Sequence, residues 1–300
     1  MKPKTLFVFS LLCLFWGIPY SLIKLALVDL SPFCVVWCRI TLGVLVLIPM
    51  AWHRGTLRPV LRHPWPILAF AILELVVPFS LIATAERSVS SSMTGVLLAV
   101  VPLAVVIIAP LFGVRETLSA RRLLGLLLGL GGVSVLLGFA TIAGRDQWLA
   151  VAGLFIAVIG YAVAPLVVQR HLAGVDGIGA VAISLGVASA ILLPFAAASL
   201  PHHLPSILSL LSIATLGLIS TALAMLLFFY LIHAAGAARA SVVAYISPAV
   251  AALLGVLVLH EHFGQSMAMG LALVLLGSAL GSSGTRSSDS KGRQLQVGLD

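Results

Sequence analysis

The chain alternates between long apolar runs and short polar segments. Ten runs reach about 20 residues, the length that an α-helix needs to cross the hydrocarbon core of a bilayer. The segments between them, such as residues 53–58 and 144–147, contain charges and turn-forming residues that the runs lack. This pattern predicts ten transmembrane helices, at residues 6–28, 33–52, 66–85, 92–114, 122–140, 148–168, 178–198, 206–235, 241–259 and 266–282.

Composition favours the same class of protein. Hydrophobic residues make up 61% of the 300 residues and charged residues only 9%, whereas a soluble domain carries about 25% charged residues. So few charges could not cover a surface that faces water, and we predict an all-α integral membrane protein. The first apolar run is too long for a signal peptide, and the Ser/Gly-rich residues 283–300 are predicted to form a disordered cytoplasmic tail.

The distribution of positive charge predicts an orientation. With the N-terminus in the cytoplasm, thirteen of the seventeen Lys and Arg residues fall on the cytoplasmic side, as the positive-inside rule requires. We therefore predict a multi-pass protein of the bacterial inner (plasma) membrane with both termini in the cytoplasm. The net charge of +8 reflects this topology, and we predict no nucleic-acid partner. The thirteen are Lys2, Lys4, Arg54, Arg58, Arg62, Arg115, Arg121, Arg122, Arg170, Arg239, Arg286, Lys291 and Arg293.

The second half of the chain repeats part of the first. Residues 115–125 and 260–270 each place a Glu nine residues before a Gly, and the two copies lie 145 residues apart. A Pro precedes each Glu, at Pro102 in the first half and Pro248 in the second. The residues that match at this offset are Glu116, Gly125 and Gly132 in the first copy, and Glu261, Gly270 and Gly277 in the second.

Five helices per half is an odd number, so a duplicated second half must enter the membrane in the opposite direction. Transporters are commonly built from such inverted repeats. We therefore predict a 5+5 inverted-topology repeat, with residues 1–142 as the first unit, 143–282 as the second and 283–300 as the tail. The inversion also explains why residues 115–125 are basic while residues 260–270 contain no Lys or Arg.

Three features carry a resemblance to a known family. They are Trp16 and Gly17 with Lys24 in the first helix, Pro32 followed by Arg39 in the second, and the twice-used Pro, Glu, Gly signature. Because these features occur together and in this order, the chain resembles the EamA-like group of the ten-helix drug/metabolite transporter superfamily. The resemblance implies a central cavity lined by helices one, three, four, six, eight and nine. Several members of the group resemble exporters of amino acids and related metabolites.

The first predicted helix offers a candidate solute-binding face. Trp16, Tyr20 and Lys24 recur every four residues, which places two aromatic rings and an ammonium along one side of a helix. The alternative is that Trp16 packs against a neighbouring helix and Lys24 reaches the outer membrane interface near Asp29.

Glu74 lies near the middle of the third predicted helix. An ionisable group there must face a cavity or a partner, because its insertion costs about 2.5 to 3.5 kcal/mol. We expect Glu74 to contact the solute or to carry a coupling proton, and Pro78, which shares its face, and Phe79 are further candidates for solute binding. The alternative is a protonated carboxyl bonded to a neighbouring helix.

Five residues are interpreted as gating or structural. Arg39 lies too deep in its helix to be simply exposed, and we expect it to pair with Asp29 or with backbone carbonyls. Glu116 and Glu261 stand just before helices five and ten, where the helix dipole stabilises a negative charge. Prolines within spans predict kinks that could serve as hinges. The five are Arg39, Pro102, Pro248, Glu116 and Glu261.

Tyrosines from the second half are further candidates for the cavity. Tyr161 and Tyr245 lie deep in predicted helices, where a buried hydroxyl needs a partner and a solute could supply it. Ser241 accompanies Tyr245 in the ninth helix. The cluster at residues 228–230 and His233 is interpreted as packing near the cytoplasmic surface.

Motifs for other chemistry are weak. Residues 260–262 read His-Glu-His, which lacks the His-Glu-x-x-His spacing of a zinc site, and the three cysteines form no Cys-x-x-Cys pair. We therefore predict no enzymatic activity, no metal site and no cofactor. The predicted function is a secondary transporter that exports amino acids and related small metabolites by alternating access, with protons as a candidate coupling ion. Alternatives are a nucleotide-sugar or phosphate-ester carrier, or a membrane-embedded non-transport protein.

Overall fold

The computed structural model describes residues 3–113, 119–139, 144–236, 240 and 242–282. Within these ranges the secondary structure is helical throughout, with short π and 3-10 segments joined to α-helices. Glu116, Ser241 and the predicted tail at 283–300 lie outside the described residues. The elements are α1 (Pro3–Gly17), α2 (Pro19–Ala26), α3 (Pro32–His53), α4 (Leu57–Val60), α5 (Pro64–Phe70), η1 (Ala71–Val76), α6 (Val77–Ala85), α7 (Ser91–Leu98), α8 (Val101–Ile108), η2 (Ala109–Phe112), α9 (Ala120–Phe139), α10 (Arg145–His171), α11 (Gly177–Ala197), α12 (Ile207–Ala214), η3 (Thr215–Leu223), α13 (Ala224–Ala235), α15 (Val243–Leu259) and α16 (Gln265–Ser282).

Seven helical stretches in the described part of the chain are long and apolar enough to span a membrane. They match seven of the ten predicted helices. The other three predicted helices coincide with shorter apolar stretches, at Leu123–Leu136, Val243–Leu259 and Gln265–Leu280. The seven are Pro3–Ala26, Pro32–His53, Pro64–Ala85, Ser91–Phe112, Arg145–His171, Gly177–Ala197 and Ile207–Ala235.

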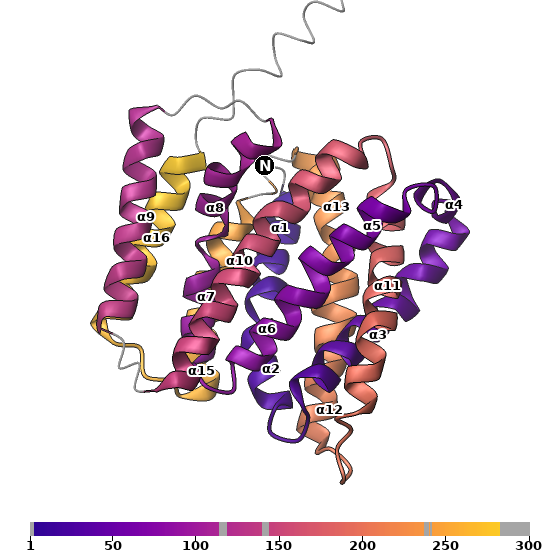
Figure 1. Cartoon of the computed structure of the whole chain (residues 1–300), viewed down its shortest axis with the longest axis horizontal. Helices are drawn as coiled ribbons and strands as arrows, with labels where there is room; N and C mark the ends of the chain where they lie inside the picture. Colours follow the sequence, from indigo (N-terminus) through magenta and orange to yellow (C-terminus); the bar gives the residue numbers. More distant parts are fainter. Residues whose placement is uncertain (1–2, 114–118, 140–143, 237–239, 241, 283–300) are drawn as a thin grey trace, which may run out of the picture.

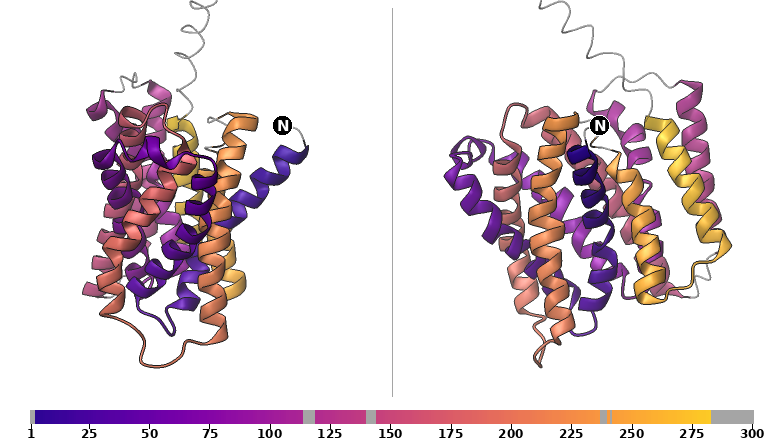
Figure 2. Two further views of the ribbon diagram at one scale, coloured as in Figure 1. Left: turned by 90° about the vertical axis from the view of Figure 1, so that its right-hand side faces the viewer. Right: turned by 180° about the vertical axis from the view of Figure 1, so that it is seen from behind.

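The helices run roughly side by side, and their connecting segments gather at the two ends of the bundle (Figure 1). α9 and α16 pack together at one edge, and α3 and α11 pack together toward the opposite edge (Figure 2). The start of α1 and the end of α16 lie at the same end, which we call the N-end (Figure 2). The other end, which we call the far end, carries the segments 27–31, 86–90, 198–206 and 260–264.

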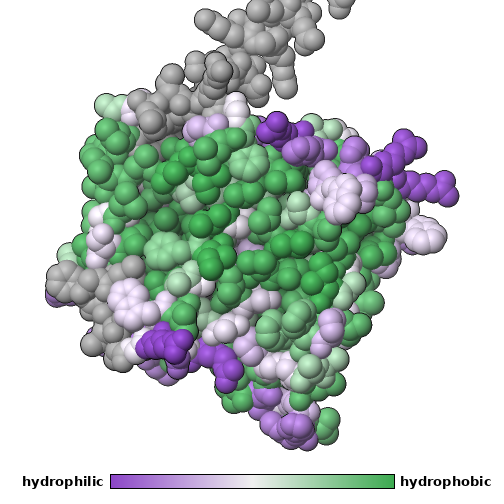
Figure 3. Space-filling view, viewed as in Figure 1, coloured by the Kyte–Doolittle hydropathy of each residue, from purple (hydrophilic) through white to green (hydrophobic). Residues whose placement is uncertain are grey.

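A broad apolar belt covers the face seen in Figure 3, and hydrophilic residues gather above and below it. Large hydrophobic side chains such as Leu45, Ile107, Leu211 and Leu257 are exposed. On a water-soluble protein such a patch would be a liability. Here the belt is the surface that a lipid bilayer covers.

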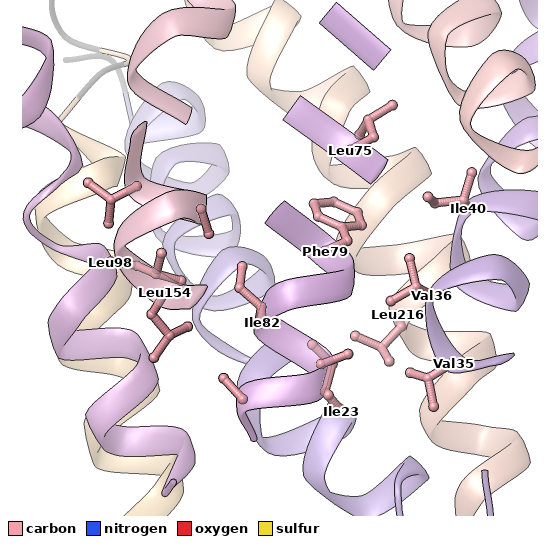
Figure 4. Packing of buried hydrophobic residues seen from close by; sticks show 14 of the residues in the cluster. Ile23, Val35, Val36, Ile40, Leu75, Phe79, Ile82, Leu98, Leu154 and Leu216 are labelled. Atoms are coloured by element: carbon pink, nitrogen blue, oxygen red, sulfur yellow. The ribbon is translucent and has the colours of Figure 1, made fainter. Parts of the chain in front are cut away.

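The two halves of the chain share one core. α3 packs on α11, α6 on α10 and α7 on α15, so each of these pairs joins an element of the first half to one of the second. Figure 4 shows Leu75 and Ile82 from the first half in the same cluster as Leu154 and Leu216 from the second. Neither half could bury its apolar faces in this way without the other.

Glycines bring α9 and α16 into backbone contact. A Cβ added at Gly132 would lie 2.8 Å from the carbonyl oxygen of Gly270, and one added at Gly277 would lie 2.5 Å from that of Gly125. Because the contact moves from 132 to 125 on α9 as it moves from 270 to 277 on α16, the two helices are antiparallel. These four glycines are the ones that match at the 145-residue offset.

Two other features recur at the same offset. Ser31 caps the N-terminus of α3 by accepting from the Cys34 amide, and Asp176 caps α11 by accepting from the Gly179 amide. The π segment η1 in the first half corresponds to η3 in the second, because residues 71–76 map onto 216–221.

The prolines lie at helix breaks and inside helices. Pro19 starts α2 directly after α1 ends, and Pro102 follows the turn between α7 and α8. Pro165 lies inside α10 and Pro248 inside α15. Pro102 and Pro248 thus belong to the fourth and ninth predicted helices, which pack together through α7 and α15.

Candidate functional site

Glu74 lies in η1, which is continuous with α5 and α6. Pro78 lacks an amide hydrogen, so it cannot donate to the carbonyl of Glu74 as an α-helix would require. The chain widens there, and the Val77 amide donates to the carbonyl of Ile72, five residues back. The buried Oε2 atom of Glu74 has no hydrogen-bond partner among the described residues. An orphaned carboxyl oxygen inside a membrane protein marks a place where a proton or a solute can bind.

Arg39 crosses from α3 to the second half of the chain. Its Nε donates to Oγ1 of Thr221 at 2.9 Å, and its guanidinium lies 4.1 Å from the centre of the Phe79 ring. The side chain is only 8% exposed. The expected pairing with Asp29 or with backbone carbonyls is therefore wrong, because a hydroxyl and an aromatic face together hold this cation.

Tyr161 lies in the same region as Arg39 and Glu74. Tyr161 of α10 lies within electrostatic range of Tyr20, Glu74 and Arg39. A Cβ added at the preceding residue, Gly160, would lie 2.5 Å from the carbonyl oxygen of Leu73, so α10 approaches η1 backbone to backbone. This close approach places the backbone at Tyr161 next to the segment that carries Glu74. We call Tyr20, Arg39, Glu74, Phe79 and Tyr161 the central polar cluster.

Lys24 does not reach the membrane interface near Asp29. Its ammonium donates to the carbonyl oxygens of Glu86 at 2.5 Å and of Val89 at 2.6 Å. These carbonyls belong to the segment between α6 and α7, and Lys24 closes the space between that segment and α2. The interpretation of Lys24 as a residue that extends to the outer surface beside Asp29 is therefore wrong.

Glu86, at the end of α6, is a buried acid that the sequence analysis missed. Its side chain is 0% exposed, and neither carboxyl oxygen has a hydrogen-bond partner among the described residues. Glu86 lies in electrostatic range of Lys24, Glu261 and Arg39. The neighbouring Arg87 made the position resemble an exposed loop. The spacing of Phe79, Ile82 and Glu86 on one helical face was the signal that could have found it.

Trp16 lies before Pro19, and Tyr20 and Lys24 lie after it, in the helical stretch Pro3–Ala26. Pro19 has no amide hydrogen to donate, but the Ile18 amide donates to the carbonyl of Leu14 and the Leu22 amide to that of Ile18, so the three residues lie on one helical stretch as expected. The Trp16 ring lies 4.9 Å from that of Phe228 in α13 and belongs to a separate apolar cluster. The packing alternative therefore describes Trp16.

Two acids hold helix N-termini across the two halves at the far end. Asp29 accepts from the Ser206 amide at 2.8 Å, from the Ser206 hydroxyl and from the Ser209 hydroxyl at 2.6 Å, and so caps α12. The hydrogen bonds from Ser206 and Ser209 lower the pKa of Asp29 to about 2. His203 lies 3.8 Å from the same carboxylate.

Glu261 accepts from the amides of Ser91 and Ser92 at 2.7 and 2.9 Å, and from the Ser92 hydroxyl at 2.7 Å. Burial opposes ionisation of Glu261, but the hydrogen bonds from Ser92 and Ser91 outweigh it and leave the pKa below its ordinary value. We expected Glu261 to serve the N-terminus of its own following helix. It caps α7 of the other half instead.

The remaining candidates lie elsewhere. Tyr245 is half-buried in α15, and Pro248 is buried one turn further along the same helix. A groove of about 450 Å³ between α6 and α10 contains Thr84, Arg87, Ser88 and Asp146. None of the central polar cluster lines that groove.

These features define a multi-pass helical membrane protein with buried ionisable groups where its two halves meet. The family model described as the EamA-like transporter family matches residues 3–138 and again residues 148–283. The chain belongs to this family.

Relatives agree with this assignment, and a solved structure shares the fold. The chain is 25% identical over 284 residues to the uncharacterized transporter YvbV of Bacillus subtilis, covering 91% of this chain and 90% of that protein. It is 28% identical over 249 residues to the uncharacterized inner membrane transporter YedA of Escherichia coli K12, covering 81% of this chain and 79% of that one. A solved crystal structure has a TM-score of 0.69 at 22% identity, covering 96% of this chain and all of the other, and so shows the fold.

Proposed function

We propose that this membrane transporter is a secondary carrier that exports amino acids and related small metabolites by alternating access. The observation that carries the proposal is the buried, unpartnered Oε2 of Glu74 beside Tyr161, at the junction of the two halves. A solute with an amino group could supply the missing hydrogen bond, and the tyrosine rings offer an apolar or zwitterionic solute a matching surface. Protons are the proposed coupling ion.

An inverted 5+5 repeat is part of the proposal. The match of one family model to both halves supports a duplication. The helix pairs support it as well: α1 contacts α15 and α10 contacts α8, which are equivalent pairs if the two halves exchange places. The paired π segments and the antiparallel glycine contact between α9 and α16 follow the same rule. With five helices in each half, the second would be inverted.

The binding residues are assigned within this framework. Tyr20, Glu74 and Tyr161 are proposed to contact the solute, with Pro78 and Phe79 shaping the wall behind them. Tyr245 and Ser241 are proposed to complete the site from the ninth helix. Pro102 and Pro248 are proposed hinges, and Glu116 is proposed to stabilise the fold at the cytoplasmic side.

A carrier of phosphate esters is less compatible with the cations of the site. The guanidinium of Arg39 is held by Thr221 and Phe79, and the ammonium of Lys24 is held by two carbonyls. A phosphate would have to displace these partners to be neutralised. An amino-acid or amine-containing metabolite needs no such exchange.

Counterflow in proteoliposomes tests the proposed function. Vesicles that contain the purified protein are loaded with a panel of unlabelled amino acids, and uptake of each labelled one is followed at two pH values. Accumulation above that in protein-free vesicles would establish a carrier and rank its solutes. The absence of accumulation for every amino acid would contradict the proposed substrate class. The same assay with other metabolites then tests transport itself.

A further inference from the structure

Glu86 has surroundings that differ from those of Glu74. It is the C-cap residue of α6, at the start of the segment that leads into α7, and its side chain is fully buried. Both of its carboxyl oxygens lack a hydrogen-bond partner among the described residues. An ionised carboxylate without hydrogen bonds is strongly disfavoured in a buried site, so this arrangement suits a carboxyl that holds a proton.

Charged groups approach Glu86 from three other elements. Lys24 and Tyr20 of α2, Arg39 of α3 and Glu261 of the segment between α15 and α16 lie within electrostatic range of its carboxyl. Two of these groups are cations that would stabilise an ionised carboxylate, and Glu261 is an acid that would oppose it. The state of Glu86 is therefore set by a balance that a small movement of Lys24 would change.

Lys24 is placed to make such a movement. Its ammonium donates to the carbonyl oxygen of Glu86 itself and to that of Val89, so the carboxyl of the same residue is within reach of the flexible lysine chain. Val89 precedes Ser90, the N-cap of α7, and the amides of the next two residues, Ser91 and Ser92, donate to Glu261. Lys24 and Glu261 thus hold the start of α7 from two sides.

We propose that Glu86 is a second proton-binding site, and that release of its proton transfers the Lys24 ammonium from these carbonyls to the Glu86 carboxylate. In the arrangement that the structure shows, Glu86 is a neutral acid and Lys24 holds the segment 86–90 through the carbonyls of Glu86 and Val89. When the O–H bond of Glu86 breaks and the proton passes to water, Lys24 remains an ammonium and pairs with the new carboxylate. The carbonyl of Val89 then has no partner, and of the two residues that hold the start of α7, Lys24 and Glu261, only Glu261 still does so.

Only the link between proton release at Glu86 and solute movement rests on the proposed transport function. Proton binding at Glu86 is testable without a solute. Infrared difference spectroscopy detects the carbonyl stretch of a protonated carboxylic acid, which is distinct from that of a carboxylate and shifts in D2O. The sample is the full chain in phospholipid vesicles, titrated across the neutral and mildly alkaline range.

We expect a protonated-carboxyl band that titrates with pH, that is absent in Glu86→Gln and that remains in Glu74→Gln. Lys24→Met should move the midpoint of this band upward by about 1 to 3 pH units, because it removes the nearest cation. Lys4→Met is the matched control, since Lys4 lies over the ring of Tyr230 instead. Should Glu86→Gln fail to fold, Lys24→Met still reports on the band.

Several outcomes would overturn the proposal. A Glu86 band that persists at every pH would make Glu86 a permanently neutral structural acid, and the lack of any such band would make it an ionised one. A band removed by sodium at constant pH would indicate a metal cation instead of a proton. A titrating Glu86 band together with failed counterflow would leave the proton site standing and refute only the transport proposal.

Discussion

Arg39 and Thr221 stand 182 residues apart in the chain, yet the Nε of one donates to the hydroxyl of the other at 2.9 Å. The contact joins α3 of the first half to η3 of the second. Thr221 also donates to the carbonyl of Leu216, so the arginine is tied directly to the π-helical backbone. A cation that is buried inside the protein needs such a partner.

Thr221→Val should therefore lower stability markedly. The change keeps the shape of the side chain but leaves the buried arginine without its hydrogen bond, at a cost of about 1.5 to 3 kcal/mol. Thermal unfolding in detergent measures it. The matched control is Thr41→Val in α3, which removes a neutral hydroxyl pair with Ser189 at 2.8 Å and should cost about 1 kcal/mol. Equal losses in the two variants would show that the Arg39 bond adds nothing.

The contact between α9 and α16 predicts opposite effects for two glycines. Gly277→Ala places a methyl group 2.5 Å from the backbone of Gly125 and Gly129, and this overlap should destabilise the protein by about 1 to 3 kcal/mol. Gly131→Ala on α9 has open space around the new methyl group, and it should stabilise the helix by up to about 1 kcal/mol. Melting temperatures in detergent compare the two. If Gly277→Ala left the melting temperature unchanged, the close contact between α9 and α16 would not contribute to stability.

Asp29 should make stability depend on pH in an acidic window. Its pKa is lowered in the folded protein, from an ordinary 3.8 to about 2, so its stabilising effect is complete above pH 3.8 and is lost as the pH falls toward 2. Asp29→Asn should be less stable than the natural protein near neutral pH and should approach it at about pH 2. Unfolding temperatures measured across this window test the expectation.

Ser90→Ala is the control for that titration. Ser90 caps α7 by accepting from the Met93 amide, so its loss weakens a helix end without removing a carboxylate. We expect a decrease in melting temperature that is the same at every pH. If Asp29→Asn behaves in the same way, the carboxylate of Asp29 does not act through its charge.

Glu74→Gln should reduce solute exchange by about tenfold or more, since a charged or protonatable hydrogen-bond partner is replaced by an amide. It should also abolish the pH dependence of exchange between the two assay conditions. Counterflow with the best solute of the panel measures both effects. Ser80→Ala, which alters a buried hydroxyl two residues after Pro78, is the control that should leave exchange unchanged. Full exchange with unchanged pH dependence in Glu74→Gln would remove Glu74 from the proposed mechanism.

The apolar pattern located the spans because each bilayer crossing needs a long uncharged run. It also picked out Glu74, since an acid in the middle of such a run stands out. The partners of the charged residues could not be predicted in the same way. Arg39 contacts Thr221, and Glu261 contacts Ser92, because the two halves interleave. No local spacing reports on contacts made at that distance in the chain.

The stretch Pro3–Ala26 shows a second reason. The periodic pattern placed Trp16, Tyr20 and Lys24 on one helix, but it could not tell which neighbours their side chains would contact. Trp16 packs in one apolar cluster, and Tyr20 packs against another. Pro19 was visible as a kink signal, but the direction in which the chain turns depends on the packing of α1 against α13 and α15.

The two π segments have a mechanical consequence. A π turn accommodates one residue more than an α turn, and that surplus residue can shift along a helix without unfolding it. Each shift rotates the intervening side chains by about 100°, the angle between successive residues of an α-helix. In η1 the rotation would swing Glu74 away from Tyr161, and in η3 it would pull Thr221 from Arg39. Each half could thus rotate its buried polar side chains about the helix axis while the axis itself stays in place.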